Sequence, residues 1–93
     1  MSDTHAQFER LATELAPLCE HISVRTDEAG LFILAIGLKG THTLELRQLR
    51  DKYILEQWHG ATAEVERVVD RPSFSDPGAA IAEAKRWLSK DAV

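Results

Sequence analysis

Histidine offers the most versatile chemistry in this chain, because an imidazole can bind a metal ion or move a proton near neutral pH. Four histidines are spread along the sequence, at His5, His21, His42 and His59. If Arg50-Asp51 forms a two-residue hairpin loop, His42 lies opposite His59, and these two imidazoles could share a metal. No third ligand has a fixed spacing from this pair. We therefore interpret the histidines as surface residues and expect neither a metal nor another cofactor.

The same hairpin register would place Glu45 opposite Glu56. Like charges directly opposite each other are unfavourable in a ladder, and this argues against that register. The two glutamates could also be read as a catalytic carboxylate pair. Because both glutamates lie on predicted strands, we interpret them as part of a solvated face that also carries Arg47.

The single cysteine, Cys19, lies two residues before His21 and could form a thiolate–imidazole pair. Its position falls on the apolar stripe of the first predicted helix, so we interpret it as a core residue. The sequence contains no Ser-His-Asp order, glycine-rich phosphate loop, HExxH or CxxC motif. We therefore predict that the protein is not an enzyme.

The composition favours a small acidic protein with one domain over residues 1–93. Eleven Lys and Arg against fifteen Asp and Glu give a formal charge of −4, so we expect no nucleic-acid or membrane partner. Double-stranded RNA-binding domains share a helix–strands–helix order, but they need lysines where the last helix begins. Here that segment reads DPGAAIAEAK, with no basic residue before Lys85. One cysteine and an N-terminus without an apolar run predict a cytoplasmic location.

Two amphipathic helices are predicted at the ends of the chain. Apolar residues at helical spacing predict the first helix over residues 4–18, with Pro17 near its end. Ser75-Asp76-Pro77 places a capping residue before a proline and predicts the start of the last helix. Between the helices, alternating segments separated by turns predict strands at His21–Thr26, Leu31–Leu38, Thr41–Leu49 and Lys52–His59. Residues 63–71 suit a fifth strand, and a helix remains an alternative there.

This element order predicts an α+β fold, a two-layer sandwich with an antiparallel meander of four or five strands. Short turns make neighbouring strands pair in sequence order. Two helices can cover one face of such a sheet, so its other face stays open.

The stretch LFILAIG, Leu31 to Gly37, is apolar on both faces of its strand. A sheet with one wet face should alternate instead. The sequence does not decide which side of this strand meets the helices. We place one set of side chains on the open face, next to two apolar residues of the following hairpin, and predict a partner-binding patch of Phe32, Leu34, Ile36, Ile54 and Trp58. Trp58 is expected to be exposed there, whereas Trp87 belongs to the inner stripe of the last helix.

Two alternatives remain for this face. A strand register shift, or the 72–75 loop with Phe74, could fold over it, and nothing would then bind there. A second copy of the chain could also cover it, which would give a homodimer.

The second half of the chain, from KYILEQWHG through SFSDPGAAIAEAKRWL, resembles the C-terminal half of some small bacterial immunity proteins, which are antitoxin-like inhibitors. The overall plan is also similar to small type III secretion chaperones, which are acidic and often dimerise. Neither resemblance implies a role for a particular residue. Together with the open face, they lead us to expect a non-enzymatic protein of the immunity or inhibitor type that covers a protein partner. A homodimeric secretion chaperone or adaptor is the second hypothesis, and a small ligand-binding protein or enzyme with a pocket between helices and sheet is the third.

Overall fold

A computed structural model describes residues 3–38, 42–59 and 68–89. The chain begins with helix α1 (Asp3–Leu15) and a 3₁₀ turn, η1 (Ala16–Leu18). Four long strands follow, β1 (Cys19–Asp27), β2 (Gly30–Gly37), β3 (His42–Leu49) and β4 (Lys52–His59). Two short strands, β5 (Val68–Asp70) and β6 (Ser73–Phe74), precede the last helix, α2 (Pro77–Leu88). Neither described helix is long and apolar enough to cross a bilayer.

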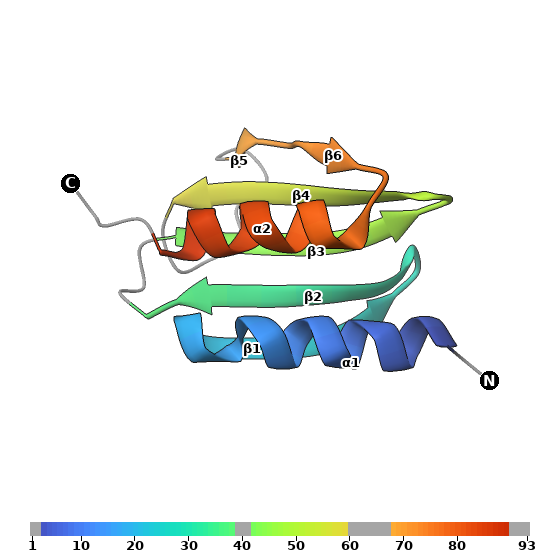
Figure 1. The fold of residues 1–93 in the computed structure, drawn as a ribbon, viewed down its shortest axis with the longest axis horizontal. Helices are drawn as coiled ribbons and strands as arrows, with labels where there is room; N and C mark the ends of the chain where they lie inside the picture. Colours follow the sequence, from blue (N-terminus) through green and yellow to red (C-terminus); the bar gives the residue numbers. More distant parts are fainter. Residues whose placement is uncertain (1–2, 39–41, 60–67, 90–93) are drawn as a thin grey trace.

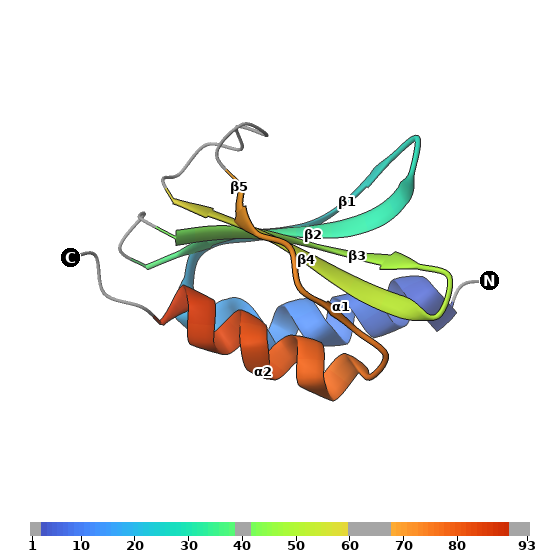
Figure 2. The same ribbon diagram turned by 90° about the horizontal axis from the view of Figure 1, so that it is seen from above.

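The sheet is an antiparallel meander in the order β1-β2-β3-β4-β5, with β6 paired to β4 (Figure 1). Both helices pack on one face of this sheet, and the opposite face is left without a helix (Figure 2). The predicted α+β sandwich is therefore confirmed, including a sheet edge formed by β5 within the segment expected as the fifth strand. Residues 63–67 of that segment lie outside the described part of the chain.

The local signals for the helix ends are also present in the structure. Pro17 lies within η1, and the α-helix ends at Leu15, before the predicted limit. Cys19 consequently opens β1 and does not belong to the helix. At the other end, the Asp76 carboxylate caps α2 by accepting a hydrogen bond of 3.0 Å from the Ala79 N–H.

The core lies between the helices and the inner face of the sheet. Its fully buried strand residues are Ile33, Ala35, Leu44, Leu46 and Leu55. Helix side chains close it from the other side, namely Phe8, Leu11, Leu15, Ile81, Ala84, Trp87 and Leu88. The apolar strand is thus assigned: Ile33 and Ala35 face the helices, and Phe32, Leu34 and Ile36 face away from them.

Candidate functional site

The side of the sheet without helices is named the open face, and strand register places its side chains in three groups of cross-strand neighbours. Phe32 lies beside Arg47 and Ile54, Leu34 lies beside Glu45 and Glu56, and Ile36 lies beside Thr43 and Trp58. All five predicted patch residues are therefore on the same face. Their exposure differs, and this changes what each can contribute to binding.

Leu34, Ile36 and Ile54 are half-buried, so part of each side chain meets solvent. Phe32 is covered, because the Arg47 guanidinium lies 4.3 Å from its ring centroid. Trp58 is only 2% exposed, so the prediction of an exposed tryptophan is wrong. Alternation along β4 assigns Trp58 to the open face correctly, but it cannot tell whether other segments cover that position.

The alternative that Phe74 folds over the open face is also wrong. Phe74 pairs with Tyr53 in the β4–β6 ladder, on the side of the helices, and it packs against the core. Strand β6 was not predicted, because two residues are too short to show alternation. In the β4–β6 ladder, Ser73 is the β6 residue on the open face, and it lies beside Ile54.

Arg47 is fixed on the open face by two carboxylates. Its Nη1 and Nη2 donate to Asp27 over 3.0 and 2.6 Å, and its Nε donates to Glu45 over 2.8 Å. The bidentate bond from Arg47 lowers the pKa of Asp27 below its usual value, and the same pairing raises the pKa of Arg47. This network holds the guanidinium over Phe32 and ties β3 to the end of β1.

The β3–β4 register follows the two-residue loop Arg50-Asp51, and Glu45 does lie opposite Glu56. The expectation that repulsion between the two glutamates disfavours this register is wrong, because each glutamate pairs with its own arginine. Glu45 accepts from Arg47, and Arg71 pairs with Glu56 over 2.9 Å. Arg71 follows β5 and is remote from β4 in the sequence, so local spacing gave no sign of it.

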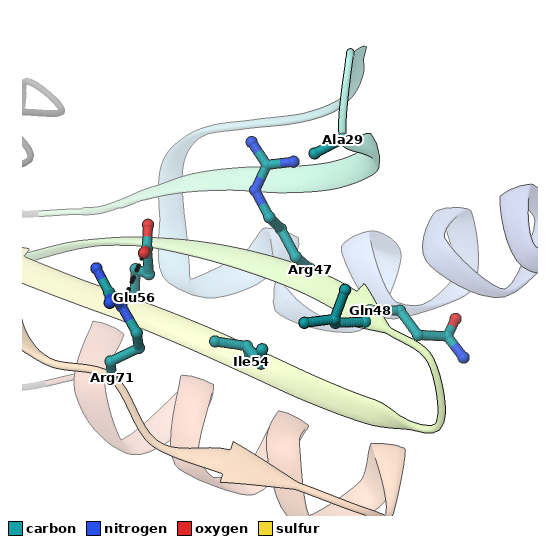
Figure 3. A pocket seen from close by; sticks show the side chains of 7 residues that line it. Ala29, Arg47, Gln48, Ile54, Glu56 and Arg71 are labelled. Carbon is teal, nitrogen blue, oxygen red and sulfur yellow. Dashed lines mark ion pairs between the residues drawn. The ribbon is translucent and has the colours of Figure 1, made fainter.

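A hollow of about 340 Å³ lies on the open face near the β3–β4 turn. Its apolar lining comes from Ile54 and from Leu49, which is 61% exposed. Figure 3 shows the Glu56–Arg71 ion pair on one side of this hollow and Arg47 extending from the neighbouring strand towards Ala29. Leu49 and Arg71 were not predicted in the patch; Leu49 could have been found, because it shares the alternation of Glu45 and Arg47.

The two histidines lie opposite each other as predicted, at the far end of the same hairpin. Their ring centroids are 5.0 Å apart, and both rings lie against Trp87, at 4.8 Å for His42 and 5.4 Å for His59. Within residues 3–38, 42–59 and 68–89, no group of three or more His, Cys, Asp or Glu residues could hold a metal ion. His42 is buried, so it is a packing residue and the expectation of a surface histidine is wrong for it.

Cys19 is half-buried against the core, and its Sγ donates to the Leu15 carbonyl oxygen over 3.3 Å. Burial raises the pKa of this thiol to about 11. A thiol with such a pKa is almost entirely protonated at neutral pH, which is unfavourable for a nucleophile.

Comparison of the chain with protein-family models, with curated proteins and with solved structures finds no match.

Proposed function

We propose that the protein is a non-enzymatic binding protein that covers a partner protein with its open face. The observation that carries this proposal is a row of partly exposed apolar side chains on the only sheet face without a helix in the described chain. Leu34 and Ile36 of β2 and Ile54 of β4 supply this apolar row, with Glu45 and Arg47 of β3 between the two strands. Exposed Leu49 extends it at the hollow. Apolar surface surrounded by charged groups is typical of a protein contact.

The ion pairs on the open face support the same proposal. Arg47 is held by two carboxylates and Arg71 by one, so these charged groups keep their positions when a partner approaches. Such preorganisation lowers the entropy that a partner must overcome on binding. Burying the apolar row would stabilise a complex by several kcal/mol, at about 25 cal/mol per Å².

An immunity or inhibitor type of function suits this surface, because such a protein acts by covering another protein. The groups that could have carried chemistry have other contacts: Glu45 and Glu56 are in ion pairs, His42 packs on Trp87, and Cys19 has a raised pKa. Trp58 and Phe32 lie on the same face but are buried, so the contact itself is assigned to Leu34, Ile36, Ile54 and Leu49. We propose a cytoplasmic location for this activity, in keeping with the single thiol.

The experiment compares two lysine variants as baits in extracts of the cells that make the protein. Ile54→Lys places a charge in the apolar row, whereas Ala82→Lys places the same charge on the exposed side of α2, on the other face of the molecule. We expect the wild type and Ala82→Lys to retain the same discrete protein, and Ile54→Lys to lose it while its melting temperature shows that it is folded. Equal retention by both variants would contradict the assignment of the open face.

A further inference from the structure

Strand β1 forms one edge of the sheet and pairs only with β2. Within residues 3–38, 42–59 and 68–89, no strand pairs with its other side. It has nine residues, and its sequence, CEHISVRTD, contains no proline or lysine. Edge strands of this length usually carry such residues, because free backbone groups attract another strand. The opposite edge differs, because β4 is flanked there by β5 and β6.

The β1–β2 turn determines which backbone groups of β1 are free. Asp27 pairs with Gly30 across the two residues Glu28 and Ala29. The pair that closes a two-residue hairpin exchanges both backbone hydrogen bonds, and hydrogen-bonded pairs then alternate along the ladder. Ser23, Arg25 and Asp27 therefore bond to β2. The N–H and C=O groups of the intervening residues, Ile22, Val24 and Thr26, point away from the sheet.

We propose that this edge pairs with β1 of a second copy of the chain, antiparallel and with the two-fold axis at Val24. Val24 then lies opposite Val24 of the second copy, and Ile22 lies opposite Thr26 of the second copy. Each of these hydrogen-bonded pairs exchanges two hydrogen bonds, so all the outward backbone groups between residues 22 and 26 are satisfied. This inference is independent of the proposed function, because the dimer uses the edge and leaves the open face free.

The side chains of β1 suit this register on both faces. On the inner face, Ile22 and Val24 are half-buried and pack against the core, and the register brings their exposed parts together across the axis. On the open face, His21 lies opposite Asp27 of the second copy, and Ser23 lies opposite Arg25 of the second copy. Neither of these pairs brings two charges of the same sign together, which would be unfavourable across a ladder. An axis at Ser23 would instead place His21 opposite Arg25, and an axis at Ile22 would reach the irregularity between Cys19 and His21.

The two-fold axis is perpendicular to the sheet, because residues that face each other must lie on the same side of both sheets. Both pairs of helices consequently lie on one side of the joined sheet. The two open faces lie together on the other side, and the proposed contact surface doubles in width. A partner with two equivalent sites, or one broad surface, would be bound by both copies at once.

The first test is the solution mass by light scattering over a range of concentrations. We expect twice the 10.4 kDa of one chain for the wild type. Thr26→Pro removes one outward N–H from each copy and should raise the dimer dissociation constant at least tenfold. Thr26→Val keeps that N–H and should leave the constant unchanged. A wild-type mass of one chain at all concentrations would overturn the proposal, as would a dimer that Thr26→Pro leaves intact and Ile54→Lys dissociates.

A second test applies even if Thr26→Pro does not fold. Hydrogen-bonded partners in an antiparallel ladder have Cα atoms about 5.5 Å apart, which is within reach of a disulfide. In a Cys19→Ser background, Val24→Cys should form a disulfide-linked dimer under mild oxidation. Ala82→Cys, on the exposed side of α2, should stay monomeric on a non-reducing gel. Failure of Val24→Cys to crosslink faster than Ala82→Cys would overturn the proposed register.

Discussion

Gly37 is the last residue of β2, and it lies where that strand passes under the end of α2. A Cβ atom at this position would be 3.0 Å from the Leu88 carbonyl oxygen and 3.3 Å from the His42 carbonyl oxygen. Both neighbours are backbone atoms, so they cannot avoid the new methyl group by changing a side-chain rotamer. We therefore expect Gly37→Ala to push the C-terminal turn of α2 away from the sheet.

The magnitude follows from two opposed effects. Overpacking of this kind costs about 1–3 kcal/mol. Replacing glycine by alanine restricts the unfolded chain and returns about 0.4–1 kcal/mol where the backbone conformation is allowed. From the centres of these two ranges, the net destabilisation is about 1.3 kcal/mol. With a urea m-value of about 1 kcal/mol/M for a chain of this size, the unfolding midpoint should fall by about 1.3 M.

Urea unfolding followed by circular dichroism measures this shift. Gly30→Ala is the matched control, because Gly30 has a φ of 111° and open space around its Cβ position. It tests backbone strain without a clash, whereas Gly37→Ala tests a clash without that strain. An unchanged or raised midpoint for Gly37→Ala would refute the close approach of β2 and α2.

Four further outcomes are expected. Arg50 has a φ of 60° in the β3–β4 turn, so Arg50→Gly should raise the melting temperature; a lowered value would contradict strain there. Arg47 lowers the pKa of Asp27, so the part of the stability that Arg47→Met loses through Asp27 should be fully present above the ordinary aspartate pKa and should vanish as the pH falls through the depressed pKa, while the loss of the Phe32 contact remains. A pH-independent difference in unfolding midpoints would contradict this. Cys19 should react with a thiol reagent at pH 8 far more slowly in the native state than in urea, given a pKa of about 11. The buried Nε1 of Trp58 has no hydrogen-bond partner among the described residues, so Trp58→Phe should change the unfolding midpoint far less than Trp58→Ala, and equal losses would contradict this.

Local patterns predicted the elements and most of the hairpin geometry. The Arg50-Asp51 loop and the alternation on each side of it were enough to place His42 opposite His59. The helix cap at Asp76 could also be predicted from the sequence, because a cap depends on residues within one helical turn.

The errors came from contacts between distant parts of the chain. Arg71 pairs with Glu56 but is distant from it in the sequence. The expected repulsion between Glu45 and Glu56 therefore did not take this compensating charge into account. The alternation of β4 gave the correct face for Trp58 and no information about what lies over it. Arg47 over Phe32 shows the same limit, because a charged residue on a wet face was not expected to cover an aromatic ring.

Photo-crosslinking inside the cells that make the protein tests the binding role of the open face most directly. A benzophenone amino acid would replace Leu34, which is half-buried on the open face, or Ala82, which is exposed on α2. The account predicts one discrete crosslinked protein from position 34, lost on adding Ile54→Lys, and no such product from position 82. Crosslinking from position 82 and none from position 34 would contradict the account.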